Sequence, residues 1–97
     1  MSEETVKKIR KFFKDKPVIK AYLFGSYARN EQEEDSDIDI LVELDHTKPV
    51  GLKFITMKLE LEELLGTRVD LVSMPGISKY IQPSIDKDKI KIYEREN

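Results

Sequence analysis

The sequence predicts an α/β or α+β domain in which helices pack on a mixed β-sheet. Segments with helical periodicity alternate with short runs of β-branched and aromatic residues, in the order helix, strand, strand, helix, strand, helix, strand. Apolar residues make up 39% and charged residues 37% of the 97 positions, a composition typical of globular proteins. Because no linker or repeat divides the chain, we expect residues 1–97 to form a single domain.

The N-terminal helix is expected at residues 2–14. Ser2 is suited to cap this helix, and Glu3 and Glu4 suit the positive end of its dipole. Pro17 ends the helical pattern. The apolar side chains recur at helical spacing and share one face: Val6, Ile9, Phe12 and Phe13.

The first strand is expected at residues 18–24. Its sequence, VIKAYLF, is rich in β-branched and aromatic residues, and it ends abruptly at Gly25-Ser26. A short helical turn at residues 27–29 and a polar loop at residues 30–36 are expected to follow.

The clearest strand is expected at residues 37–44, DIDILVEL, because acidic and apolar side chains alternate at its start. Pro49 is then expected to open a helix that Gly66 closes as a C-cap. This second helix holds Leu52, Ile55, Leu59 and Glu62.

The C-terminal third is expected to add two strands and one helix. RVDLVS at residues 68–73 is the third strand, and residues 74–76 form a turn. A helix is expected at residues 77–86 despite Pro83, and IKIY at residues 90–93 forms a short final strand.

The composition excludes several classes of protein. Without cysteine there is no disulfide framework or thiolate site, so any metal must bind oxygen ligands or the single His46, which is expected in a loop. The apolar runs are too short for a transmembrane helix, and the N-terminal segment lacks the apolar core of a secretory signal. We therefore expect a cytoplasmic protein with no membrane partner.

The charges are unevenly distributed, although the net charge is only −2. Eight acidic residues and no Lys or Arg lie between positions 30 and 47, whereas the first helix is rich in lysine. A uniformly basic surface for nucleic acid is therefore not expected. The lysine-rich face is expected to be solvated, with contact to a partner or RNA as the alternative, and the acidic segment is expected to need counter-ions.

Three aspartates form the first candidate site. Asp37 and Asp39 lie two residues apart on a strand, so they project from the same face, and hard oxygen ligands at this spacing suit Mg²⁺. Asp70 lies between Val69 and Leu71, so its side chain projects from its strand on the face opposite these two apolar residues. If strands 37–44 and 68–73 pair antiparallel, the three carboxylates converge, and such a cluster can hold two divalent ions for phosphoryl or nucleotidyl transfer. The alternative for each aspartate, and above all for Asp70, is a solvated strand acid.

The end of the first strand forms the second candidate site. Where a strand turns straight into a helix at Gly25-Ser26, free backbone N–H groups can bind an anion, and the serine hydroxyl adds a donor. Arg29, one turn further on, can reach the same phosphates. A plain turn is the alternative for the Gly-Ser pair, and pairing with the acidic loop is the alternative for Arg29.

Together, GSYAR at residues 25–29, the acidic loop and SDIDILV at residues 36–42 resemble the minimal nucleotidyltransferases (MNT) of the DNA polymerase β-like superfamily. The signature of that superfamily is Gly-Ser, a spacer and then Asp-x-Asp. The resemblance covers nearly the whole chain and includes Asp70 as the third acid. Asn30 departs from the Gly that usually follows the Arg, but Asn tolerates left-handed backbone conformations, so we expect the turn to be kept.

The resemblance implies a palm-like nucleotidyltransferase fold that works with two Mg²⁺ ions and ATP. Asp37 and Asp39 would bind both ions, and Asp70 would bind one and help to deprotonate the acceptor hydroxyl. Gly25 and Ser26 would hold the β- and γ-phosphates. Members of this family often act as antitoxins of HEPN-domain toxins, either by transferring AMP to a toxin tyrosine or by binding alone.

Three functions therefore remain open at this stage. Because the chain has no segment that would hold an acceptor, transfer to a hydroxyl of a bound protein is favoured. The second function is a non-catalytic antitoxin that masks its partner, although the intact acidic residues argue against a decayed site. The third is modification of a small molecule, such as an aminoglycoside, in a pocket completed across a homodimer.

Overall fold

The described part of the chain forms a four-stranded sheet. The computed structural model describes residues 2–33, 36–45, 47, 49–74 and 87–96. The strand order is β3-β2-β1-β4, and the strands span Val18–Phe24 (β1), Ile38–Leu44 (β2), Val69–Met74 (β3) and Ile90–Glu94 (β4). β1 is antiparallel to β2 and β4, whereas β2 and β3 are parallel. The predicted mixed sheet is confirmed.

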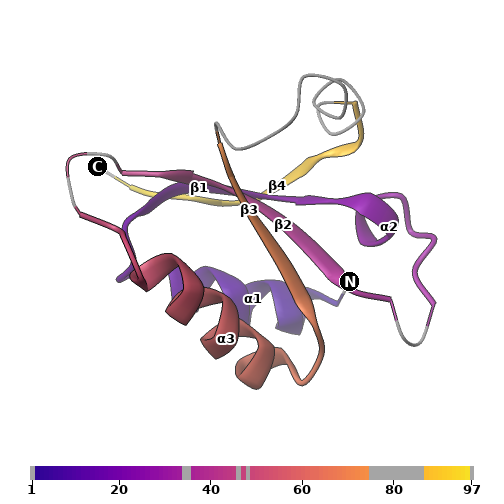
Figure 1. The fold of residues 1–97 in the computed structure, drawn as a ribbon. Helices are drawn as coiled ribbons and strands as arrows, with labels where there is room; N and C mark the ends of the chain where they lie inside the picture. Colours follow the sequence, from indigo (N-terminus) through magenta and orange to yellow (C-terminus); the bar gives the residue numbers. More distant parts are fainter. Residues whose placement is uncertain (1, 34–35, 46, 48, 75–86, 97) are drawn as a thin grey trace.

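Two helices cover one face of this sheet (Figure 1). α1 (Glu3–Phe13) and α3 (Lys53–Leu65) lie side by side below it and contact each other. The Ser2 hydroxyl accepts a hydrogen bond of 3.2 Å from the backbone N–H of Thr5, which confirms the predicted N-cap of α1. A short helix, α2 (Gly25–Ala28), follows β1 directly and begins two residues earlier than expected.

The start of α3 differs from the prediction. The helix begins at Lys53 and not at Pro49, because Gly51 has a positive φ of 47° that interrupts a right-handed helix. The backbone N–H of Lys53 bonds instead to the carbonyl of Val50 at 2.8 Å, which forms a turn before the helix. The C-terminus is as predicted, since Gly66 adopts the left-handed conformation of a C-cap.

The core lies between the sheet and the two helices. Alternate side chains of β2 enter it, and so do those on either side of Asp70. The principal buried residues are Ile9, Phe13, Ile38, Ile40, Val42, Met57, Leu61, Val69 and Leu71. Because strand side chains alternate between faces, Asp39 and Asp70 lie on the sheet face away from α1 and α3.

The expectation that strands 37–44 and 68–73 pair antiparallel is wrong. β2 and β3 run parallel, with Asp39 opposite Asp70 in the register. The physical reason is the connection between them, because α3 returns the chain to the end of the sheet from which β2 started. A parallel pair in this register still brings the two aspartates side by side.

The remaining expectations concern the C-terminal third and the loops. The short final strand is confirmed and extends to Glu94. The helix expected at residues 77–86 and the loop position of His46 lie outside the described residues. None of the helices in the described ranges is long and apolar enough to cross a membrane.

An ion pair joins two chain segments at the end of the sheet farthest from Asp39. Asp45 is the buried charged residue of the described core, and Arg95 Nη1 donates to its Oδ2 at 2.7 Å. The backbone N–H and the hydroxyl of Thr47 donate to the other oxygen. The hydrogen bonds from Thr47 and Arg95 hold the pKa of Asp45 well below its usual range. This contact holds Arg95, the residue after β4, against Asp45, the residue after β2.

Candidate active site

The turn after β1 lies directly against β2. Phe24 and Asp39 are cross-strand partners, so Gly25, the next residue, stands beside the Asp39 carboxylate. Gly25 has a φ of +71°, a left-handed conformation that glycine adopts without strain. A Cβ at this position would collide with Asp39 Oδ2 and would lie 3.0 Å from Asp39 Cγ. The turn therefore requires glycine for its backbone conformation and for the space it leaves.

Asp39 lies at the centre of the three predicted aspartates. It is half-buried, with the Gly25 turn on one side and Asp70, its register partner on β3, on the other. Asp70 and Asp37 are exposed. Asp39 and Asp70 alternate with buried core residues of their strands, as the sequence predicts, whereas Asp37 lies just before β2, which begins one residue later than expected.

Electrostatics connect these groups with Arg29. Burial, together with the negative charges of Asp70 and Asp37, raises the pKa of Asp39 to about 6, while the charge of Arg29 opposes the shift. Asp39 therefore lies within electrostatic reach of two carboxylates and one guanidinium. The site combines partial burial with repelling negative charges, and a bound cation would relieve that repulsion.

The donor set fits Mg²⁺ by its chemistry. In the ranges that the structure describes, no three acidic or histidine side chains are gathered closely enough to enclose a metal ion as they stand. The carboxylates of Asp39 and Asp70 nonetheless project from adjacent strands in register, and carboxylate oxygens are the hard ligands that Mg²⁺ prefers.

The Gly25-Ser26 turn has the features expected of an anion site. The first turn of α2 has no side-chain cap, and none of the other described residues hydrogen-bonds to the Ser26 hydroxyl. The Ser26 carbonyl accepts from the backbone N–H of Glu31 at 2.8 Å, which folds the loop back onto α2. Asn30 adopts a φ of 59°, so the expected left-handed turn is confirmed without glycine.

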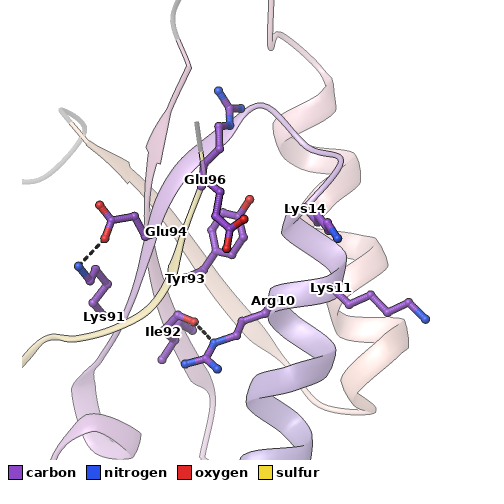
Figure 2. A pocket seen from close by; sticks show the side chains of 9 residues that line it. Arg10, Lys11, Lys14, Lys91, Ile92, Tyr93, Glu94 and Glu96 are labelled. Carbon is purple, nitrogen blue, oxygen red and sulfur yellow. Dashed lines mark hydrogen bonds and ion pairs between the residues drawn. The ribbon is translucent and has the colours of Figure 1, made fainter.

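A groove on the described part of the chain lies elsewhere. Its volume is about 930 Å³, and it runs between the C-terminal half of α1 and the edge strand β4 (Figure 2). Arg10 extends from α1 to the strand, where its Nε donates to the Ile92 carbonyl at 2.7 Å. None of the predicted site residues lines this groove. Among the described residues, the candidate site therefore lies apart from this groove.

Comparison with a sequence profile identifies the protein family of this chain. The profile of the family described as "Nucleotidyltransferase domain" matches residues 6–95. The chain belongs to that nucleotidyltransferase family. The match spans every described helix and strand except the start of α1, so it includes the Gly-Ser turn and all three aspartates.

Two relatives of this nucleotidyltransferase chain come from archaea. A Methanocaldococcus jannaschii protein, provisionally named a protein adenylyltransferase, is 47% identical over 92 residues, which are 93% of each chain. The protein adenylyltransferase MntA of Thermococcus cleftensis is 43% identical over 70 residues, which are 72% of this chain and 70% of that protein.

Two solved structures resemble this nucleotidyltransferase fold closely. A crystal structure of a toxin–antitoxin with AMP-PNP superposes with a TM-score of 0.78 at 26% identity, covering 94% of this chain and 74% of the other. A complex of a tri-AMPylated Shewanella oneidensis HEPN toxin with an MNT antitoxin superposes with a TM-score of 0.74 at 25% identity, covering 97% and 73%. The expected nucleotidyltransferase fold is therefore confirmed.

Arg29 of this nucleotidyltransferase already has two acidic partners. Its Nε donates to Glu31 at 3.2 Å and its Nη1 donates to Asp88 at 3.3 Å, and both contacts raise its pKa. The first contact is the pairing with the acidic loop that the sequence left open. Asp88 was not foreseen, since it lies 59 residues away and no local pattern marks it.

Glu62 is a second residue whose contact the sequence did not reveal. It belongs to α3, and its Oε2 accepts a hydrogen bond of 3.1 Å from the backbone N–H of Val69, the residue before Asp70. Its other oxygen pairs with Lys58 at 3.3 Å. The spacing of Lys58 and Glu62 by four residues is a signal for that ion pair, but nothing local predicts the contact with β3. Through this bond, α3 helps to fix the start of β3 beside β2.

Proposed function

We propose that this chain transfers AMP from ATP to a hydroxyl group, a tyrosine of a HEPN-type toxin, and thereby acts as the antitoxin of that pair. The single observation that carries the proposal is the contact of Gly25 with Asp39, because it joins a turn suited to phosphates with carboxylates suited to metal. The relatives named protein adenylyltransferase and the solved HEPN–MNT complex support the same reaction.

We propose that Asp37, Asp39 and Asp70 hold two Mg²⁺ ions, in line with their oxygen donors and with the raised pKa of Asp39. Bound Mg²⁺ supplies Lewis-acid polarisation and neutralises charge on the phosphates. Asp37 is exposed and Asp39 half-buried on the same face, so the pair presents oxygens both to solvent and to the turn.

The phosphates are proposed to lie on the Gly25-Ser26 turn. The backbone of Gly25 is open because it carries no side chain, and the Ser26 hydroxyl is available as a donor. The β- and γ-phosphates would bind there and leave as pyrophosphate. Arg29 is held by Glu31 and Asp88. It would donate its remaining guanidinium N–H groups to the same phosphates.

The transfer step needs a proton acceptor beside the acceptor oxygen. The tyrosine oxygen attacks the α-phosphorus, the bond to the β-phosphate breaks, and the hydroxyl proton passes to a base. Asp70 is proposed as that base, because it is exposed next to Asp39 on the face that α1 and α3 leave open. A protein tyrosine can approach this face without displacing either helix.

We propose that residues 1–97 form one minimal nucleotidyltransferase domain that works in the cytoplasm. Because Asp37 and Asp70 are exposed and the groove lies elsewhere, the partner protein would hold the acceptor tyrosine in place. Recognition of the partner would then decide which hydroxyl is modified.

The test is to incubate the chain with the HEPN-domain protein encoded beside it, ATP and Mg²⁺, and to measure the intact mass of that protein. We expect the mass of one or more AMP groups on tyrosine. Asp39→Asn should abolish the gain, whereas Asp15→Asn, which changes an exposed acid at the end of α1, should not. A tight, silenced complex whose partner never gains mass would refute the transfer reaction and favour inhibition by binding.

A further inference from the structure

The lysine-rich face of α1 has no part in the candidate active site. Arg10, Lys11 and Lys14 project from the C-terminal half of this helix, and all three side chains are exposed (Figure 2). Because an α-helix advances about 100° per residue, the three lie within an arc of about 100° on its surface. None of them forms an ion pair with another described residue. This face therefore carries three positive charges that the described part of the chain leaves unneutralised.

The same three side chains line the groove of about 930 Å³ between α1 and β4. The strand side of the groove adds Lys91 and Arg95, which are paired with Glu94 at 2.6 Å and with Asp45 at 2.7 Å. Glu96 is the lining acid that has no ion pair among the described residues. The groove thus has an excess of free positive charge, although the whole chain has a net charge of −2.

Arg10 is held in the groove by the backbone of β4. Its Nε donates to the Ile92 carbonyl at 2.7 Å, which fixes the guanidinium against the strand and leaves its two terminal nitrogens free to donate (Figure 2). A guanidinium oriented in this way matches the geometry of phosphate oxygens. Lys14 lies one helical turn further on, so its Cβ is roughly 5–6 Å from that of Arg10. The two side chains can therefore contact neighbouring anionic groups.

The groove lacks the exposed apolar surface of a protein interface. None of the exposed large hydrophobic residues of the described chain lines it. The centres of protein–protein interfaces are depleted in lysine and rich in apolar and aromatic contacts. Tyr93, half-buried beside Phe13, is the aromatic residue of the lining. Grooves that bind single-stranded nucleic acids combine cations along the backbone with aromatic side chains, so these observations favour a nucleic acid over an acidic protein.

We propose that the groove between α1 and β4 binds a single-stranded nucleic acid, whose phosphates contact Arg10, Lys11 and Lys14. None of the candidate site residues lines the groove, so the strand and ATP would bind at separate places. The positive charge is confined to one helix, in keeping with the expectation that the surface as a whole is not basic. The proposal goes beyond AMP transfer and does not depend on it.

Fluorescence anisotropy with labelled oligo(U) and oligo(dT) of about 12 nucleotides tests this binding. Non-specific phosphate contacts predict a dissociation constant of about 10⁻⁴–10⁻⁶ M. Three contacts to a single strand, each contributing about −0.7, predict a slope of about −2 for the logarithm of affinity against the logarithm of salt concentration. Tighter binding of oligo(U) would support the proposal with RNA as the occupant, and tighter binding of oligo(dT) would support it with DNA.

Charge reversals make the test specific to the groove. Lys14→Glu should weaken binding about tenfold and reduce the salt slope by about 0.7. Lys53→Glu makes the same change in net charge on α3, outside the groove, and should leave the affinity nearly unchanged. Because both lysines are exposed, both variants should melt at the temperature of the wild type.

Three outcomes would overturn the proposal. The first is that neither oligonucleotide binds the wild type at about 50 mM salt. The second is an equal loss of affinity in Lys14→Glu and Lys53→Glu. The third is displacement of the oligonucleotide by poly-glutamate at the same concentration of charge, which would assign the groove to an acidic protein. AMP transfer by Lys14→Glu is measured separately and should match that of the wild type.

Discussion

The carboxylate of Asp39 lies against the backbone of Gly25, with no room for a Cβ between them. One residue belongs to the turn that ends β1 and the other to β2, so antiparallel pairing of two neighbouring strands creates the contact. A group that binds the phosphates of a nucleotide and a group that binds its metal are thereby placed side by side.

Replacement of Gly25 by alanine should remove transfer activity, because the new Cβ displaces the Asp39 carboxylate. Gly51→Ala is the matched control, since Gly51 also has a positive φ but nothing lies near its Cβ position. Both variants should lose about 1–2 kcal/mol of unfolding free energy from the left-handed backbone alone. Chemical denaturation and the AMP transfer assay measure the two effects. Equal activity in the two variants would contradict the close contact.

Asp39→Asn should lower AMP transfer at least about 100-fold and leave the fold intact. The substitution removes a half-buried charge that Asp70 and Asp37 repel, so the melting temperature without metal should hold or rise. Transfer assays and thermal denaturation in EDTA give the two readouts. A marked fall in melting temperature would instead identify Asp39 as a structural residue.

The pH dependence of stability should reveal the raised pKa of Asp39. Its pKa of about 6 in the folded chain lies above the unfolded value of about 4, so the folded state binds the proton more tightly. The wild type should therefore lose stability relative to Asp39→Asn as the pH rises from about 4 to 6. Because Asp39 is only half-buried and its charge is partly screened by solvent, we expect a change of about 1 kcal/mol. Urea titrations of both proteins in EDTA at several pH values measure the difference, and parallel curves would contradict the prediction.

The Asp45–Arg95 contact should contribute to stability with the opposite pH dependence. The pKa of Asp45 is lowered in the folded state, so its contribution is fully present above the unfolded pKa of about 4 and is lost as the pH falls through the lower folded pKa. Arg95→Met should lower the melting temperature by several degrees at pH 7 and by less at about pH 1.5, because Arg95 donates to a buried carboxylate that stays ionised until strongly acidic pH. Lys20→Met removes an ion pair of 3.9 Å with Glu94 between two largely accessible side chains and should change little at either pH. Equal losses at the two pH values would contradict this account.

The local features of the site could be predicted from the sequence because they depend on alternation and turn chemistry. Asp37 and Asp39 flank Ile38, which is buried, and Asn30 adopts the left-handed turn expected of it. The position of Asp70 on a strand between two buried residues is also a local property. Each of these features depends on only a few neighbouring residues of the sequence.

Relationships between distant segments could not be predicted in this way. The direction in which β3 runs depends on how α3 packs, and the contact of Arg29 with Asp88 joins residues at opposite ends of the sequence. The apolar residues of α3 show the same limit, since the spacing of Leu52, Ile55 and Leu59 gives no indication of which face the core covers. Tertiary packing decides these outcomes.

Titration calorimetry with ATP tests most directly whether the Gly25 turn and the aspartates form one metal–triphosphate site. We expect binding when Mg²⁺ is present, because the ion links the phosphates to Asp37 and Asp39, and loss of binding when EDTA removes it. Asp39→Asn should bind MgATP much more weakly, whereas Asp15→Asn should bind it as the wild type does. Equal affinity for ATP with and without Mg²⁺, unaffected by Asp39→Asn, would contradict the account.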